Sequence, residues 1–258
     1  MSELRLLLRQ EAFSDSGGIL TSSLTVAVVT ASIGWYLKVT AIWQLHHVFA
    51  SLISFFLLAT VINFLWLSRR ARSRFGEANQ ATLLRTGLVC LIGSTLIAGG
   101  QEPVIDWHLC ALIAFALLLD GVDGFLARRL KLTSEFGARF DMEIDALLLL
   151  ILSLLVWQTG QAGAWVMLIG LMRYAFVTAS WFCPRLATPL GPSLRRKTIC
   201  ALQGIALFTC LLPPLAQIET SAVALAALVA LAVSFMVDIR ALLRTPSSIS
   251  TVKKGAET

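Results

Sequence analysis

DGVDGFLARRLKLTSEFGARFDMEID, residues 120–145, is the most unusual segment of this sequence. It carries four aspartates between two strongly apolar segments, and these are Asp120, Asp123, Asp141 and Asp145. A charged side chain is costly in apolar surroundings, so acids placed there usually have partners and a function. The fold must therefore explain why a chain so rich in apolar residues brings four carboxylates together.

The composition predicts an all-α, polytopic integral membrane protein. Of the 258 residues, 57% are hydrophobic and only 14% are charged, whereas a soluble domain carries about 25% charged residues. A membrane-spanning helix needs about 20 predominantly apolar residues, and the sequence contains about eight such runs. The predicted spans are 19–37, 46–67, 81–99, 107–127, 142–159, 162–182, 199–216 and 220–239.

Lys and Arg are distributed unequally about these predicted spans. They gather at the N-terminus and after the second, fourth, sixth and eighth spans, while the other hinges hold only Lys38. Cytoplasmic loops of membrane proteins are enriched in Lys and Arg. We therefore predict a cytoplasmic (inner) membrane protein whose two termini and 120–145 stretch face the cytoplasm. The formal net charge of +6 is then an orientation signal and requires no nucleic-acid partner.

Helical spacing predicts that the four aspartates form two acidic faces. At about 100° per residue, one face of the first helix carries Asp120, Asp123, Gly124, Ala127 and Arg128. One face of the second helix carries Gly137, Asp141 and Asp145, whereas Glu143 points nearly the opposite way. The connection between the helices is short, which predicts antiparallel neighbours, and small residues on both faces allow close approach. The acids are expected to meet near the cytoplasmic surface.

Four carboxylates that face one another repel, and divalent cations would remove that repulsion. Mg²⁺ and Mn²⁺ prefer oxygen ligands, and four ligands on two helices suit two ions about 3.5–4 Å apart. Mg²⁺ usually keeps coordination positions for substrate phosphates, so we predict a two-metal site for phosphoryl chemistry. One alternative is a proton- or ion-coupled transporter, because intramembrane acids often mark ion pathways. Acids clustered at one membrane level argue against it.

The acidic stretch resembles the signature of the CDP-alcohol phosphotransferase (CDP-alcohol phosphatidyltransferase) family, in the pattern Asp120-x2-Asp123-Gly124-x2-Ala127-Arg128-x8-Gly137-x3-Asp141-x3-Asp145. A second segment resembles the polar start of the first core helix in many members, in the pattern Asn79-x2-Thr82-x2-Arg85. Ala78 stands where those members usually have proline. The resemblance implies a six-helix catalytic core at 75–245, after an extension at 1–74 with two transmembrane helices and before a polar cytoplasmic tail at 246–258.

The resemblance also implies an activity, which is the metal-dependent transfer of a substituted phosphate from a CDP-alcohol to a second alcohol. For bacterial-type members the donor is usually CDP-diacylglycerol, CMP is released, and the product is a phospholipid. Asp120, Asp123 and Asp141 would then hold the metals. Asp145 would complete the metal site and take the proton from the attacking hydroxyl. The residues implied in CDP binding are Asn79, Thr82, Arg85, Gly124, Ala127, Arg128 and Gly137.

Two basic residues are candidates for binding the acceptor alcohol. Arg173 lies deep in a predicted span, where it either binds the acceptor or pairs with an aspartate. Lys197 resembles the second lysine of the Lys-x-Lys-Thr stretch in glycerophosphate-using members, but it also fits an ordinary orientation charge. The acceptor is therefore predicted to be of the glycerol 3-phosphate type. DMEIDA at 141–146 departs from the Asp-Pro-Leu-Ala-Asp-Lys of those members, so other alcohols stay open. The family resemblance also implies a homodimer.

Overall fold

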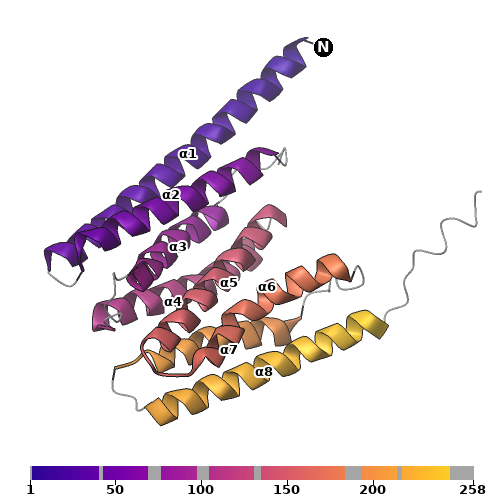
Figure 1. The fold of residues 1–258 in the computed structure, drawn as a ribbon. Coiled ribbons are helices and arrows are strands. Elements are labelled where there is room, and N and C mark those ends of the chain that lie inside the picture. The colour runs from indigo at the N-terminus through magenta and orange to yellow at the C-terminus, as the bar shows by residue number, and fades with distance from the viewer. Residues whose placement is uncertain are drawn as a thin grey trace, which may run out of the picture. The chain divides into compact units, whose positions relative to one another are not determined.

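The structure, a computed structural model, describes the backbone at 2–40, 43–68, 77–97, 105–130, 135–183, 193–213 and 217–244. It describes side chains at 20–40, 43–65, 80–97, 105–121, 137–183, 193–213 and 218–243. The α-helices found there are α1 (Ser2–Val39), α2 (Leu45–Ser68), α3 (Glu77–Ser94), α4 (Trp107–Leu130), α5 (Glu135–Gln158), α6 (Met167–Phe182), α7 (Leu194–Cys210) and α8 (Gln217–Arg244) (Figure 1). Short 3-10 turns are η1 (Thr95–Ile97) and η2 (Ala164–Val166). The all-α prediction is confirmed, with no strand in the described backbone.

Five helices in the described part of the chain are long and apolar enough to cross a membrane, which confirms a polytopic membrane fold. Their spans are Leu20–Val39, Leu45–Leu65, Gln80–Ile97, Ala164–Phe182 and Ile218–Leu243. The other three predicted spans fall on α4, α5 and α7. In α4 an apolar stretch is found at Trp107–Gly121, which is where the described side chains of this helix end. Helix α5 begins with the acidic face, and α7 has only 17 residues. The acids at the start of α5 and the length of α7 explain why these two helices do not have the length and composition of an ordinary membrane span.

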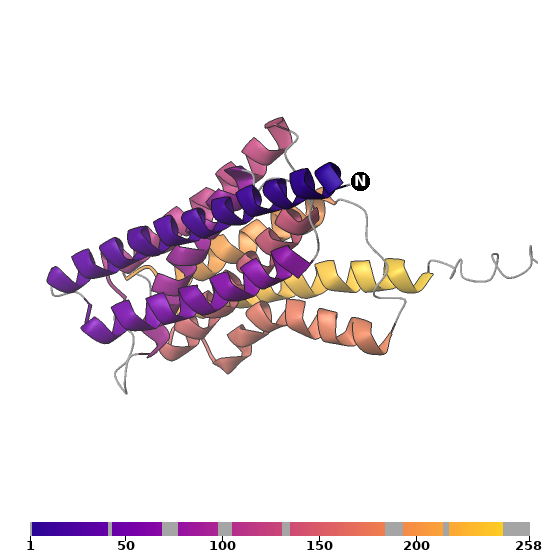
Figure 2. The same ribbon diagram turned by 90° about the horizontal axis from the view of Figure 1, so that it is seen from above.

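The helices form two compact units, comprising residues 1–151 with 211–213, and 152–210 with 214–258. In the first unit α1 packs along α2, both helices contact α3, and α3 also contacts α4. Figures 1 and 2 show α1 and α2 running side by side in both views. In the second unit α7 packs against α8, which also contacts α6. The acidic stretch therefore belongs to the first unit.

The central helix of the first unit is α3. Its Gln80–Ile97 span is 67% buried, against 28% for the spans of α1 and α2, because helices cover it on several sides. Leucine, isoleucine and valine side chains fill most of its length, but Arg85 is also fully buried there. A buried charge is costly unless it is paired and hydrogen-bonded. The position of Arg85 therefore requires acidic partners from neighbouring helices.

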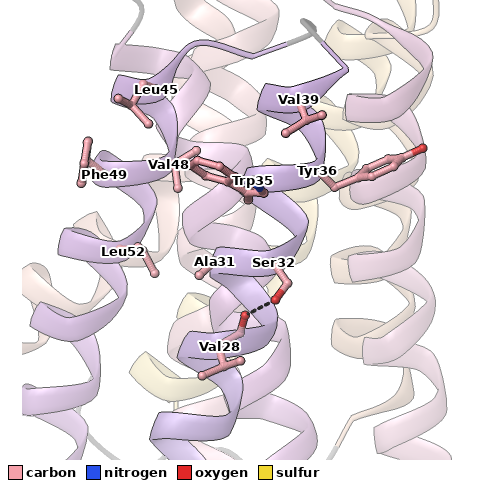
Figure 3. Close-up of a pocket in the computed structure, with 10 residues that line it drawn as sticks. All are labelled: Val28, Ala31, Ser32, Trp35, Tyr36, Val39, Leu45, Val48, Phe49 and Leu52. Atoms are coloured by element: carbon pink, nitrogen blue, oxygen red, sulfur yellow. Dashed lines mark hydrogen bonds between the residues drawn. The ribbon is translucent and has the colours of Figure 1, made fainter.

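The outer surface of α1 and α2 is apolar. A groove of about 760 Å³ runs between the two helices and is lined mainly by aliphatic and aromatic side chains (Figure 3). The Ser32 hydroxyl on its wall donates to the Val28 carbonyl oxygen at 2.8 Å. Near the end of α1 the Lys38 ammonium lies 4.9 Å from the centre of the Trp35 ring. Aromatic and basic side chains at a helix end are typical of the membrane interface, so this surface suits contact with lipid.

Polar contacts join α7 to α8 in the second unit. Arg195 forms an ion pair with Asp238, and its Nη1 donates to the Ser234 carbonyl oxygen at 3.0 Å. Further along α7, Gln203 Nε2 donates to the Ala227 carbonyl oxygen at 3.0 Å. Asp238 and Gln203 are both buried. These contacts satisfy polar groups that would otherwise be costly between apolar helices.

Candidate active site

Arg85 of α3 binds three of the four signature aspartates. Its Nη1 lies 2.5 Å from Asp120 Oδ1 on α4. Its Nη2 lies 2.6 Å from Asp141 Oδ1 and 2.8 Å from Asp145 Oδ1, both on α5. The same Nη2 also donates to the backbone carbonyl oxygen of Asp141 at 3.3 Å. One guanidinium therefore ties together carboxylates from two helices.

In this cluster the arginine is buried and the carboxylates are partly exposed to solvent. The Arg85 side chain is 0% exposed, whereas those of Asp120, Asp141 and Asp145 are 37%, 35% and 23% exposed. The protein thus supplies the positive charge from the buried side, and the carboxylates keep a side open to the outside. One guanidinium against three carboxylates leaves two formal negative charges. The open side is therefore suited to attract a cation.

Local sequence explains why the acids of α5 point the same way. Asp141 and Asp145 are four residues apart, so they lie one above the other on a helix face. Between and beside them Phe140 and Ile144 are buried, with 6% and 4% exposure, and they fix the rotation of the helix against its neighbours. Glu143 is exposed, as expected for its opposite direction on the helix. The pattern of apolar and acidic residues thus turns two carboxylates toward Arg85.

Residues around Arg85 and Asp120 are small or short. Thr82 is buried one turn before Arg85, and its carbonyl oxygen accepts a bond of 2.8 Å from the Thr86 hydroxyl. Gly121 follows Asp120 on α4, and a Cβ atom added there would meet no heavy atom within 4 Å. Among the described residues, the space at the Gly121 position is therefore open.

The three carboxylates can offer oxygen atoms that all lie within 4.8 Å of one another. An octahedral Mg²⁺ site has ligands at about 2.0–2.1 Å, which places neighbouring oxygens about 3 Å apart and opposite ones about 4 Å apart. Small side-chain rotations would bring the oxygens of Asp120, Asp141 and Asp145 into that range. The residues present therefore fit a hard divalent cation in both ligand type and spacing.

The other predicted site residues fall in several places. The side chains of Asn79 on α3, and of Asp123, Gly124, Ala127 and Arg128 on α4, lie outside the described residues. Gly137 lies on α5, one turn before Asp141. Arg173 on α6 and Lys197 on α7 belong to the second unit, and Lys197 is exposed. The structure thus brings together Arg85, Asp120, Asp141 and Asp145 among the candidates whose side chains it describes.

The pairing of Arg85 with three carboxylates was not predicted from the sequence. The family resemblance placed Arg85 among the CDP-binding residues instead. A signal was available, because Arg85 lies inside the predicted span 81–99, where a charged side chain needs a partner. The nearby acidic stretch supplied the natural candidates for that partner.

Comparison with known proteins agrees with this geometry. A family model described as CDP-alcohol phosphatidyltransferase matches residues 75–237, which include α3 to α7 and most of α8. The CDP-diacylglycerol–glycerol-3-phosphate 3-phosphatidyltransferase of Bacillus subtilis (strain 168) is 31% identical over 114 residues, which are 40% of this chain and 59% of that protein. The chain thus spans less than two thirds of this relative's length. No solved structure matches the chain.

The family match distinguishes between the two interpretations of the acidic stretch. It covers more than half of the chain and contains Arg85 together with all four aspartates. A transporter would not be expected to match this family, so the match favours the enzyme over the transport alternative. The chain belongs to the CDP-alcohol phosphatidyltransferase family and is therefore a transferase that resides in a membrane.

Proposed function

We propose that this enzyme transfers a phosphatidyl group from CDP-diacylglycerol to glycerol 3-phosphate and releases CMP. The observation that carries the proposal is the convergence of Asp120, Asp141 and Asp145 on the buried Arg85. This arrangement suits a substrate whose reacting part is a diphosphate that arrives with a divalent cation. The printed activity of the Bacillus subtilis relative supports glycerol 3-phosphate as the acceptor.

Mg²⁺ or Mn²⁺ would be held by Asp120, Asp141 and Asp145, with Asp123 as a further ligand from the sequence pattern. A two-metal site is proposed because four carboxylates offer enough oxygens for two ions. When bound, the ions would neutralise charge on the diphosphate and on the departing CMP. The remaining roles belong to the side chains of the chain itself.

Asp145 is the proposed general base. It is the least exposed of the three carboxylates and has the longest of the three distances to Arg85. Its carboxylate would accept the proton of the acceptor hydroxyl as the hydroxyl oxygen bonds to the phosphorus that carries diacylglycerol. The bond from that phosphorus to the bridging oxygen then breaks, and this oxygen leaves with CMP. Arg85 would hold the carboxylates in position throughout.

The membrane setting of the proposal follows from the charge pattern and from the two substrates. The acyl chains of the donor would stay in the bilayer while glycerol 3-phosphate arrives from the cytoplasm. This requires the active site and both termini to face the cytoplasm of an inner membrane, as the distribution of Lys and Arg predicts. The CDP-binding roles, the roles of Arg173 and Lys197, the domain bounds and the homodimer stay predictions.

The test of the proposed function is CMP release by the purified full-length protein in detergent. CDP-diacylglycerol and Mg²⁺ are supplied, and glycerol 3-phosphate, serine, inositol phosphate or choline is added in separate reactions. We expect CMP to form with glycerol 3-phosphate, together with a phosphorylated lipid product. CMP release with a different acceptor would correct the acceptor, and no release with any acceptor would contradict the proposed donor.

Removal of divalent cations is expected to stop CMP release reversibly. Without the cation the open side of the cluster keeps its negative charge and repels the diphosphate of the donor. The measurement is CMP release after treatment with EDTA, followed by titration with Mg²⁺ or Mn²⁺. Full activity in the presence of excess EDTA would contradict a role for the aspartates as metal ligands.

A further inference from the structure

The two helices that precede the matched region cover the back of the helix that carries Arg85. Residues 1–74 lie outside the family match at 75–237. Nevertheless α1 and α2 both contact α3, and they belong to the same compact unit. Figures 1 and 2 show these helices lying alongside one another. The N-terminal extension is thus packed directly against an element of the candidate active site.

Arg85 and Gly87 point to opposite sides of α3. Two residues on an α-helix are separated by about 200° around the axis and about 3 Å along it. Arg85 binds carboxylates of α4 and α5, whereas Gly87 approaches Thr30 on α1. The contact with α1 therefore lies directly behind the guanidinium-bearing turn. A shift of α3 at Gly87 would move Arg85 by a similar amount.

The approach of α1 to α3 at Gly87 is very close. A Cβ atom added at Gly87 would lie 2.4 Å from Thr30 Oγ1 and 3.1 Å from Val26 Cγ1. Both neighbours are buried, and Thr30 is only 1% exposed. Thr30 and Val26 are β-branched, so their side chains have few alternative rotamers in a helix. An added methyl group at Gly87 would therefore push the two helices apart.

The rest of this interface is ordinary in its packing. A Cβ atom added at Gly34 of α1 would lie 3.4 Å from Leu91 and 3.5 Å from Val48, which are normal van der Waals separations. Small residues allow such close helix packing in membranes. Gly34 and Gly87 therefore offer a matched pair, in which the same added methyl group is accommodated at one position and excluded at the other.

We propose that α1 positions Arg85 through the contact of Thr30 with Gly87, so that the N-terminal extension is part of the catalytic unit. Thr30 and Gly87 are positioning residues, since they act on the carboxylate cluster through Arg85. The extension holds α3 at the depth and rotation at which one guanidinium reaches Asp120 on α4 and two acids on α5. For its activity readout this inference rests on the proposed function.

The experiment compares Gly87→Ala, Thr30→Ala with Gly87→Ala, and Gly34→Ala in the full-length protein. Gly87→Ala is expected to lower kcat for CMP release by about 10- to 100-fold, since a misplacement of about 1 Å can cost about 100-fold. The double variant removes Thr30 Oγ1, the closest atom, and is expected to recover most of the lost rate. Gly34→Ala should stay within about twofold of wild type because its added methyl group makes normal contacts.

A merely structural contact would give a different pattern. It would lower the yield or the thermal midpoint of Gly87→Ala and leave kcat of the folded fraction unchanged, which would overturn the inference. If Gly87→Ala does not fold, Thr30→Ala alone provides the test, because it removes the contact without adding an atom. We then expect kcat to fall by about 2- to 5-fold with little change in KM, and an unchanged kcat would overturn the inference.

A readout without turnover separates this inference from the proposed function. Mn²⁺ binding to the carboxylate cluster can be measured by calorimetry on the same three variants. Weaker binding in Gly87→Ala, restored in the double variant, supports the inference even if wild type releases no CMP. Equal Mn²⁺ affinity in wild type and in all three variants would overturn the inference, whereas wild type that binds Mn²⁺ but releases no CMP would contradict the proposed function alone. CMP release by wild type with full kcat in folded Gly87→Ala would overturn the inference alone.

Discussion

Asp145→Asn is expected to reduce kcat for CMP release by about 10²–10⁴-fold, the usual contribution of a positioned general base. Asparagine keeps the size and shape of the side chain but cannot accept the proton of the acceptor hydroxyl. It also weakens one of the three ion pairs that Arg85 makes, at 2.8 Å in the native protein. The measurement is the initial rate of CMP release at saturating CDP-diacylglycerol, glycerol 3-phosphate and Mg²⁺.

Glu143→Gln is the matched control for this variant. It neutralises an acid on the same helix, two residues away, whose side chain is exposed on the opposite face. Glutamine keeps the size and hydrogen-bonding capacity of this side chain, which points away from the carboxylate cluster. We therefore expect Glu143→Gln to retain wild-type kcat. A folded Asp145→Asn protein with a wild-type rate would contradict the assignment of Asp145 as the base.

Arg85→Met is expected to destabilise the protein and to abolish metal-dependent turnover. Removing one partner of a buried ion pair costs about 3–5 kcal/mol when the other charge is left buried. Here the three carboxylates are 23% to 37% exposed, so water screens part of the repulsion. We therefore expect Arg85→Met to lower the free energy of unfolding by an amount near the lower end of that 3–5 kcal/mol range, about 3 kcal/mol. The measurement is the free energy of unfolding in detergent micelles, at constant pH and with EDTA present.

Arg85→Lys provides the comparison within the same position. Lysine keeps the positive charge but lacks the two separated Nη atoms that contact Asp120 on one helix and Asp141 on the other. The free energy of unfolding of Arg85→Lys is therefore expected to lie between those of wild type and Arg85→Met. Mg²⁺ should reduce the difference in stability between wild type and Arg85→Met, because a bound cation offsets the repulsion among the three carboxylates. Equal stability of wild type and Arg85→Met without metal would contradict the role of Arg85 as the buried counter-charge.

The sequence predicted the helical membrane fold because its signals are local. Apolar runs of membrane length, low charge and the uneven placement of Lys and Arg each depend on neighbouring residues alone. The same holds for the acids of 120–145, where a spacing of four residues puts Asp141 and Asp145 on one helix face. Sequence analysis could therefore predict which carboxylates share a face and that two faces should meet. In the structure, one carboxylate oxygen from each of Asp120, Asp141 and Asp145 lies within 4.8 Å of the other two.

Span prediction was less informative where helices combine apolar and charged residues. The acids at the start of α5 interrupt its apolar run. Asp141 and Asp145 are active-site candidates, so the charges that interrupt the hydropathy pattern of α5 are the ones proposed to act in catalysis. Such charges can be satisfied by hydrogen bonds and ion pairs with a side chain of a neighbouring helix. The hydropathy of one segment contains no information about a partner on another helix.

Local signals in the sequence are enough for the all-α membrane fold, for the face of α5 that carries Asp141 and Asp145 and, through the motif, for the family. Only the tertiary structure decided that the buried Arg85 is the common partner of three carboxylates, and that Thr30 of the extension packs behind it at Gly87. The physical reason is that helical periodicity specifies which side chains share a face of one helix. Which face meets which neighbour depends on packing between residues far apart in the chain, here between α1, α3, α4 and α5.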